Sequence, residues 1–249
     1  MDAAAYEMMA QTEERHWWWS GRRAILGDEL ARLRREGALP PGVLYDLGCG
    51  VGSNLPVLAR FGEAVGFDGS PLAVDAAHRL GRSGVRLADL STGAAALPDV
   101  PSGSGALVLF ADVLEHLQDE APALALAQRL LAPGGVVVIT VPALPALWGP
   151  SDVFNHHHRR YTKRTLADAV GATFDLVRLS YFNSLLLAPI AAARQLSKAL
   201  GRPGREEIGL PPAPVNAALE AIFSAERHLL AHTSLPLGVS LLCVARRRG

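Results

Sequence analysis

Val43-Leu44-Tyr45-Asp46-Leu47-Gly48-Cys49-Gly50-Val51-Gly52-Ser53 is the stretch that decides the fold. A short apolar run ends in Asp46, and three glycines then occupy alternate positions. Apolar residues at helical spacing follow, over residues 53–61. This order predicts a strand, a tight glycine turn and a helix, which together form the first unit of a doubly wound α/β sheet. Glycines let a ligand lie against the main chain, and a helix start offers free N–H groups, so the turn predicts a ligand site.

Strand and helix patterns continue to alternate after this unit. Ser70 is expected to cap a helix that begins at Pro71. The predicted fold is α/β, with a doubly wound, seven-stranded, mostly parallel sheet whose last strand is antiparallel to the sixth. The expected strands are residues 43–47, 64–68, 85–88, 106–110, 136–141, 174–179 and 237–245, and the expected later helices include residues 119–131 and 162–170.

The chain is expected to form a single domain, residues 1–249. An N-terminal helical cap, residues 1–40, precedes a cofactor-binding core, residues 41–182. A helical insertion, residues 183–234, precedes the last strand and tail, residues 235–249.

Acidic residues follow four of the expected strands. Asp68 lies 22 residues after Asp46, and Asp89 and Asp112 follow the third and fourth strands. Ligands bind beyond the carboxyl ends of strands in open α/β sheets, so four carboxylates there indicate a site. Ser53 stands where a dinucleotide fingerprint has glycine, and no lysine completes a phosphate loop. This set resembles the class I S-adenosylmethionine-dependent methyltransferases, over roughly residues 44–142.

The resemblance implies a cofactor, S-adenosyl-L-methionine, which is converted to S-adenosyl-L-homocysteine. It implies that the glycine turn passes under the methionine and ribose, that Asp68 accepts from the ribose hydroxyls, and that Asp89 accepts from the adenine amino group. Asp46 is expected to hold the turn or to reach the cofactor's amino group. The implied cofactor-binding residues are Asp46, Gly48, Cys49, Gly50, Asp68, Gly69, Ser70, Asp89, Leu90, Ala111 and Asp112.

Histidines are the candidate general bases for methyl transfer. His116 lies four residues after Asp112, and His157 lies in the loop after the fifth strand, which is similar to a loop over the active site in some bacterial members of the family. Each histidine also has a structural interpretation, in helix packing or in pinning the loop. Trp18, Arg160 and Tyr161 are the candidate substrate-binding residues. No metal is expected, because adjacent histidines 156–158 point in different directions and no ligand spacing stands out.

Composition limits the partners. The formal net charge is zero, which disfavours nucleic acid as a substrate. No apolar run is long enough to span a bilayer, so a cytoplasmic protein is expected, as a monomer or homodimer. The acceptor is expected to be a small or lipid-like molecule, because the apolar insertion suits a pocket wall; a membrane-facing surface, a dimer contact and a cover for the sheet edge stay open. A non-catalytic cofactor-binding module, or an enzyme of this fold that catalyses another reaction such as cyclisation, is the alternative function.

Overall fold

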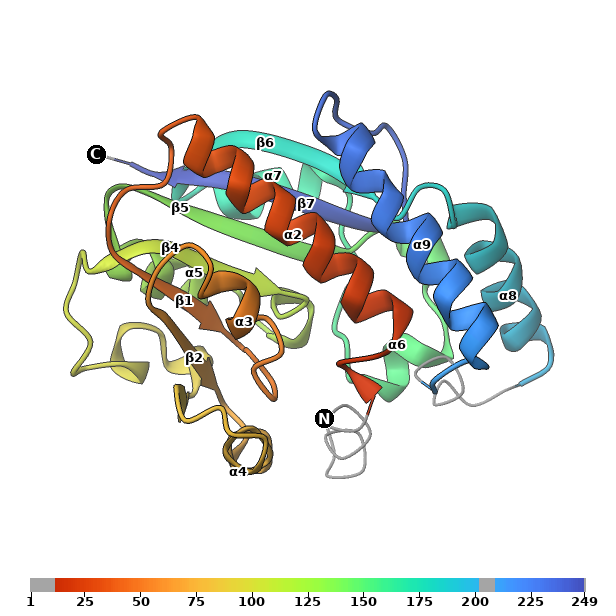
Figure 1. Cartoon of the computed structure of the whole chain (residues 1–249), viewed down its shortest axis with the longest axis horizontal. Helices are drawn as coiled ribbons and strands as arrows, with labels where there is room; N and C mark the ends of the chain where they lie inside the picture. Colours follow the sequence, from red (N-terminus) through yellow and green to blue (C-terminus); the bar gives the residue numbers. More distant parts are fainter. Residues whose placement is uncertain (1–11, 202–208, 249) are drawn as a thin grey trace.

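The computed structural model describes residues 12–201 and 209–248 of the chain. Their sheet has seven strands in the order β3-β2-β1-β4-β5-β7-β6 (Figure 1). β7 pairs antiparallel with both of its neighbours, and the other pairs are parallel. The predicted doubly wound sheet is confirmed. The strands are β1 (Val43–Leu47), β2 (Ala64–Asp68), β3 (Val85–Leu87), β4 (Gly105–Ala111), β5 (Leu131–Pro142), β6 (Phe174–Phe182) and β7 (Ser240–Arg247).

The order of the strands reverses between β1 and β4. From β1 the chain builds outward through β2 and β3, and it then returns to place β4 on the other side of β1. A ligand site is expected beyond the carboxyl ends of the strands at such a reversal. Because β1, β2 and β4 end at Leu47, Asp68 and Ala111, the glycine turn, Asp68 and Asp112 meet at this edge of the sheet.

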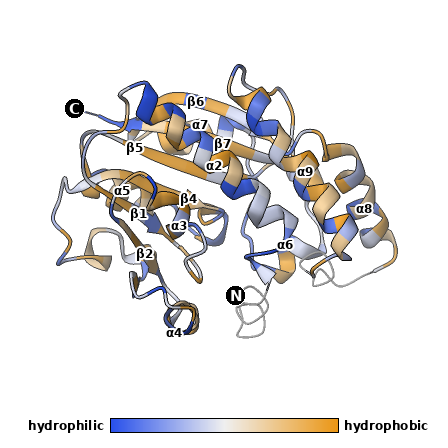
Figure 2. Ribbon diagram, in the orientation of Figure 1, coloured by the Kyte–Doolittle hydropathy of each residue, from blue (hydrophilic) through white to orange (hydrophobic). Residues whose placement is uncertain are grey.

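Helices cover both faces of the sheet, and strand side chains alternate between the two cores. In β5, Val137 and Ile139 pack with α5 and α7, whereas Val136 and Val138 pack with α2 and α9. A strand buried on both faces is nearly continuously apolar, as Figure 2 shows along β5. The helices are α2 (Trp17–Arg35), α3 (Leu55–Leu58), α4 (Pro71–Arg79), α5 (Ala121–Leu130), α6 (Pro150–Phe154), α7 (Lys163–Gly171), α8 (Leu187–Ala199) and α9 (Ala213–Leu230), with short 3₁₀ turns η1 (Leu90–Ala96), η2 (Leu114–His116) and η3 (Pro145–Leu147).

Helices α2 and α9 lie side by side on one face of the sheet (Figure 1). The rings of Trp17 and Trp18 lie 5.7 and 5.2 Å from the Phe223 ring of α9. Trp19 instead lies edge-on against His16, with ring centroids 4.9 Å apart. The side chains of the three adjacent tryptophans therefore lie in two different environments, as expected for consecutive residues at the start of a helix.

Three local details differ from the sequence prediction. The helix expected over residues 53–61 is α3, which has only four residues and is flanked by turns; Gly52 before it has a φ of +79°. Pro71 does begin α4, but the Ser70 side chain makes no capping hydrogen bond; its backbone N–H donates to Asp68 instead. β5 starts earlier than expected, at Leu131, because that residue pairs with Gly105 of β4.

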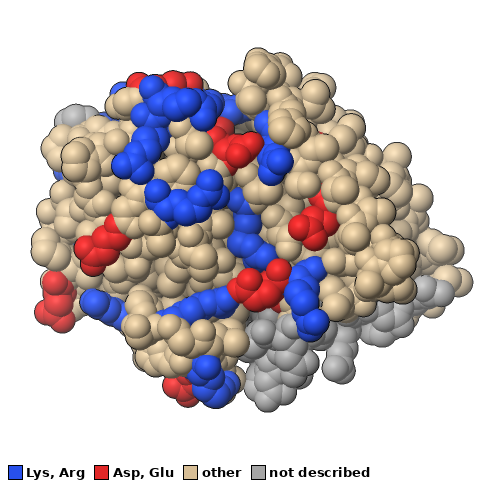
Figure 3. Space-filling view, in the orientation of Figure 1, with Lys and Arg blue, Asp and Glu red and all other residues tan. Residues whose placement is uncertain are grey.

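The described surface carries charges of both signs. On the face shown in Figure 3, acidic side chains lie among the more numerous lysines and arginines. Within residues 12–201 and 209–248, no helix combines the length and apolar character that crossing a bilayer requires.

Candidate active site

A cavity of about 780 Å³ lies at the carboxyl ends of the strands. This volume is within the range of pockets that enclose small-molecule ligands. Asp46 and Tyr161 do not line it. The cavity wall includes the other predicted site residues, which are Trp18, Gly48, Cys49, Gly50, Asp68, Gly69, Ser70, Asp89, Leu90, Ala111, Asp112, His116, His157 and Arg160.

The glycine turn is fixed by backbone bonds to β2. The N–H groups of Gly48 and Cys49 donate to the carbonyl of Phe67 at 2.7 and 3.0 Å. Gly48 has a φ of +75°, and a Cβ placed there would lie 2.6 Å from both methyl groups of Val113. The turn therefore requires glycine at this position for its backbone angle and for its close packing.

Asp68 holds the glycine turn and the start of α4 together. Its Oδ2 accepts a hydrogen bond from the Gly50 N–H at 2.7 Å, and its Oδ1 accepts one from the Ser70 N–H at 2.9 Å. Burial raises the pKa of Asp68, while these two N–H groups lower it. A carboxylate oxygen has more than one acceptor site, so both oxygens remain able to accept from a ligand in the cavity.

Asp46 lies behind the cavity and not in its wall. The side chain is fully buried, and its Oδ2 accepts a hydrogen bond from Asn54 Nδ2 at 3.2 Å. Asn54 does line the cavity. Of the two roles expected for Asp46, the geometry therefore favours holding the turn. Burial raises the pKa of Asp46 to about 7, although Asn54 and Arg22 oppose the shift.

Asp46 should make the protein less stable as the pH rises. Its pKa in the folded state, about 7, exceeds the ordinary value of 3.8, so the folded state binds the proton more tightly. The stabilisation is therefore complete below about pH 4 and is lost as the pH rises toward 7, by up to about 1.4 kcal/mol per pH unit. Denaturant unfolding of the wild type and Asp46→Asn should show a stability difference that favours the variant increasingly from pH 5 to pH 8. A difference that does not change with pH would contradict this prediction.

The third predicted acid lies at the outer end of the cavity. Asp89 is exposed and its Oδ1 accepts hydrogen bonds from the backbone N–H and hydroxyl of Ser91, at 3.0 and 2.7 Å. Leu90 beside it is buried. The pair therefore offers one carboxylate and one apolar side chain to a ligand that extends outward from the glycine turn.

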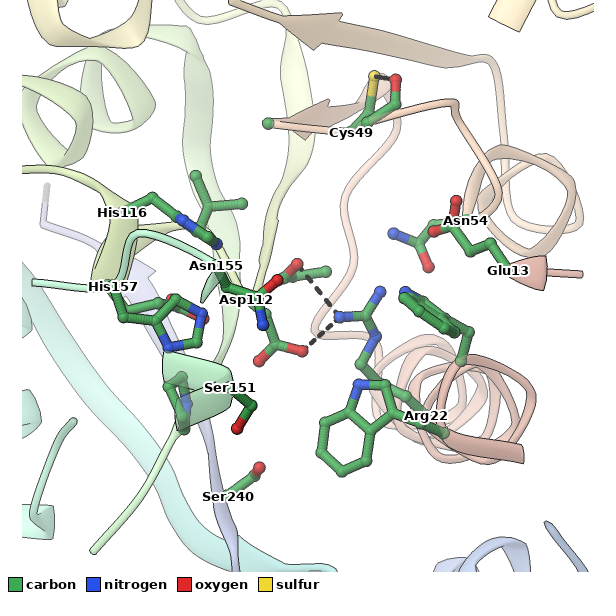
Figure 4. A pocket seen from close by; sticks show the side chains of 18 of the residues that line it. Glu13, Arg22, Cys49, Asn54, Asp112, His116, Ser151, Asn155, His157 and Ser240 are labelled. Carbon is green, nitrogen blue, oxygen red and sulfur yellow. Dashed lines mark hydrogen bonds and ion pairs between the residues drawn. The ribbon is translucent and has the colours of Figure 1, made fainter. Parts of the chain in front are cut away.

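Asp112 lies in the cavity wall just beyond the end of β4. Its backbone has a φ of +58°, and its N–H donates to the carbonyl of Thr140 at 2.9 Å. Arg22 of α2 forms an ion pair with Asp112 and also donates to the carbonyl of Ala111 at 3.2 Å (Figure 4). Arg22 is 4% exposed, so it belongs to the buried cavity wall. Helix α2 therefore packs on the sheet and also contributes Arg22 to this end of the cavity wall.

A second group of polar side chains lies across the cavity from Arg22. His116 and His157 lie on the same side in Figure 4, with ring centroids 4.7 Å apart. Asp152 Oδ1 lies 2.9 Å from His157 Nδ1 and 2.8 Å from Arg160 Nε, and its Oδ2 lies 3.1 Å from Arg194 Nη1. Burial alone would raise the pKa of Asp152, but His157 and the two arginines hold it well below its usual range. Burial, with help from His157, lowers the pKa of His116 to about 3, so this ring is neutral at neutral pH.

Sequence reasoning missed Glu115. Its side chain is fully buried, lines the cavity, and has a pKa raised by burial and by the nearby Asp112. Its position three residues after Asp112, at the carboxyl end of the fourth strand, was the signal that could have identified it. Tyr161 was named instead, but its ring is buried in the core and its backbone bridges Ala143. Neighbouring residues of an extended chain point in opposite directions, so Arg160 faces the cavity and Tyr161 does not.

A family model described as a methyltransferase domain matches residues 18–177, which is more than half of the chain. The chain belongs to this family, the S-adenosylmethionine-dependent methyltransferases. Trans-aconitate 2-methyltransferase of Methylobacterium radiotolerans is 37% identical to this chain over 117 residues, and the match covers 45% of the chain and 42% of the relative. The chain spans less than half the length of the curated relatives it matches.

Solved structures share the fold of this chain. One is a protein of Haloferax volcanii, in complex with the Trm112 methyltransferase activator. The superposition covers 99% of this chain and 94% of that protein, with 19% sequence identity and a TM-score of 0.60. The [4+2]-cyclase SpnF covers 88% of this chain with 81% of its own, at 18% identity and a TM-score of 0.53. Both are similar in fold alone.

S-adenosylmethionine, the cofactor of the family, fits the residues present. The glycine turn leaves the main chain open to a ligand, and Asp68 and Asp89 supply acceptors for hydroxyl and amino groups. A sulfonium cation suits a wall of carboxylates and carbonyl oxygens, of which Asp112 and Ala111 provide examples. The donor set therefore matches the cofactor better than it would match a phosphate-rich nucleotide.

Proposed function

We propose that the protein transfers a methyl group from S-adenosylmethionine to an oxygen of a small, anionic acceptor. The observation that carries the proposal is that one cavity joins the glycine turn to the polar group around Asp152. When bound, S-adenosylmethionine supplies a methyl group on a sulfonium, which suits in-line displacement by a nucleophile. The residues at the far end of the cavity therefore decide the acceptor.

The charges at that end favour an anion. Arg160 and Arg194 both line the cavity, and one carboxylate, Asp152, lies between them. Both arginines present guanidinium groups to the cavity, and arginine is suited to binding carboxylate groups. A relative named for methylating trans-aconitate supports an acid as acceptor. Polar side chains of Asn183, Ser197 and Ser240 complete this end.

The site mainly has to align the acceptor with the methyl group and to exclude water, because the sulfonium is already a good leaving group. Trp18 supports the alignment of an acceptor, since it lines the cavity and its ring packs against the rings of Phe182 and Phe223, with centroids 6.2 and 5.2 Å away. The His116 and His157 rings are the groups placed to orient an acceptor oxygen or to accept its proton. Together these residues would hold the acceptor between α2 and the loop that carries His157.

Methyl-labelled S-adenosylmethionine tests the proposal. Incubation with the protein and a panel of small carboxylic and hydroxy acids should place label in an aqueous product. His157→Ala should lower turnover by about 10²-fold, since loss of an aligning contact has an effect of this size, while the affinity for S-adenosylhomocysteine stays unchanged. His158→Ala is the matched control, because this adjacent histidine is exposed and does not line the cavity.

Each other outcome has a defined meaning. Label that partitions into organic solvent from a cell extract would contradict a small anionic acceptor and would favour a lipid-like one. Cofactor binding without any transfer of label, to the panel or to extract, would contradict methyl transfer and favour a binding module or another reaction, such as the cyclisation named for one protein of similar fold.

A further inference from the structure

Glu115, His116 and His157 form a cluster in the cavity wall that methyl transfer does not by itself require. One ligand atom from each residue lies within 4.8 Å of the others. Glu115 and His116 are adjacent in η2, and His157 comes from the loop after α6. We propose that these three side chains bind a divalent first-row transition-metal cation.

Glu115 supplies the first independent observation. Its side chain is 0% exposed, and within the described part of the chain neither carboxylate oxygen has a hydrogen-bond partner. Burying a carboxyl group without hydrogen-bond partners is costly, so a ligand that supplies partners would stabilise this group. Asp112 differs, because Arg22 and Thr140 already occupy its oxygens. A cation beside Glu115 would satisfy the unpartnered oxygens.

The histidines supply the second observation. His157 Nδ1 lies 2.9 Å from Asp152 Oδ1, and a proton donated across this contact leaves the lone pair of Nε2 available. Asp152 is itself held by Arg160 and Arg194. Histidines that bind metals commonly donate their second N–H to a carboxylate or a carbonyl in this way. His116 stands edge-on to the His157 ring, with centroids 4.7 Å apart, so both imidazoles lie at the same point of the cavity wall.

The donor set selects the class of cation. Two imidazoles and one carboxylate suit zinc, cobalt or iron, whereas magnesium and calcium prefer oxygen ligands. Bonds of about 2.1 Å at tetrahedral angles place donor atoms about 3.4 Å apart. The present separations, up to 4.8 Å, would therefore close by up to about 1.4 Å when a cation binds, through rotation of the side chains in the cluster.

Three protein ligands leave coordination positions open toward the cavity. Metal sites of this kind hold a water or a substrate oxygen in the open position and lower its pKa. A role in activating the acceptor oxygen rests on the proposed function, whereas the binding of the cation does not.

Titration with Co²⁺ tests the site without any turnover. Cobalt bound by imidazole absorbs visible light, so the metal-free protein should gain saturable visible bands with one equivalent of Co²⁺, and Zn²⁺ should abolish them while Mg²⁺ should not. Glu115→Gln keeps the shape of the side chain and should weaken Co²⁺ binding at least tenfold. Asp152→Asn should weaken it by about 10- to 100-fold through His157.

His157→Ala should also weaken binding at least tenfold, and it keeps the test decisive if Glu115→Gln does not fold, because His157 is on a loop and partly exposed. The double variant His156→Ala/His158→Ala removes the exposed histidines beside it and should bind Co²⁺ as the wild type does. Three results would each overturn the site. The wild type could show no saturable bands, the bands could survive in both His157→Ala and Glu115→Gln, or the double variant could lose them. Methyl transfer to an acceptor could still occur in any of these cases, so failure of the metal site and failure of the proposed function are distinguishable.

Discussion

Asp68→Ala is expected to weaken the binding of S-adenosylhomocysteine by about 100-fold while the protein remains folded. The carboxylate lies at the end of β2 and lines the cavity at 7% exposure. Hydrogen bonds to a charged group contribute about 1.5–3 kcal/mol each. Loss of the charge-assisted bonds to the two ribose hydroxyls would therefore remove at least about 2.7 kcal/mol, which corresponds to the factor of 100.

Part of the loss would be indirect. Asp68 also accepts from the N–H groups of Gly50 and Ser70, so alanine at position 68 frees the turn that we expect to support the cofactor. Asp68→Asn separates the two effects, since its single side-chain oxygen can keep one acceptor but not the negative charge, and we expect an intermediate affinity.

Isothermal titration of S-adenosylhomocysteine makes the measurement, with circular dichroism as the check on folding. Asp75→Ala is the matched control, because Asp75 is an exposed acid of α4 that does not line the cavity, and its affinity should equal that of the wild type. If Asp68→Ala bound the ligand as tightly as the wild type does, Asp68 would not belong to the cofactor site.

The sequence was sufficient to bring together the residues around the glycine turn, because this half of the cavity is built from local patterns. Each of Gly48, Asp68 and Asp112 follows an apolar run directly, and the sheet topology brings the carboxyl ends of those runs together. No long-range contact needs to be known. The same logic placed Asp46 at a strand end, but whether its side chain faces the cavity or the interior depends on how Asn54 and the short helix α3 pack, which periodicity does not encode.

The acceptor half was less predictable because its residues come from segments far apart in the chain. Arg194 of α8 reaches Asp152 over a separation of 42 residues, and nothing in the pattern of α8 marks it. Arg160 and Tyr161 are adjacent in an extended segment, so one of them had to face away from the cavity, yet the bridge to Ala143 that decides which one is a tertiary contact. Glu115 was overlooked for a similar reason: its burial without a partner becomes evident only when the loop of His157 covers it.

Gly48→Ala should have the largest effect on folding stability, a loss of about 2–5 kcal/mol. Two independent costs add at this position. A φ of +75° costs a side chain about 1–2 kcal/mol. The added Cβ would also lie 2.6 Å from both methyl groups of Val113, and overpacking of this kind costs about 1–3 kcal/mol. Because Gly48 lines the cavity, we expect weaker cofactor binding as well.

Two further variants separate the costs of Gly48→Ala in denaturant unfolding. Gly37 has a similar φ of +66° with nothing within 4 Å of a Cβ, so Gly37→Ala should lose only the backbone cost of about 1–2 kcal/mol. Val113→Ala removes the methyl groups that the new Cβ would meet. The double variant Gly48→Ala/Val113→Ala should therefore lose less free energy of unfolding than the sum of the two single variants, by about 1–3 kcal/mol. Should Gly48→Ala cost no more than Gly37→Ala, or should the pair prove additive, the close packing of the glycine turn against Val113 would not limit this position. The requirement for glycine would then come from the backbone angle alone.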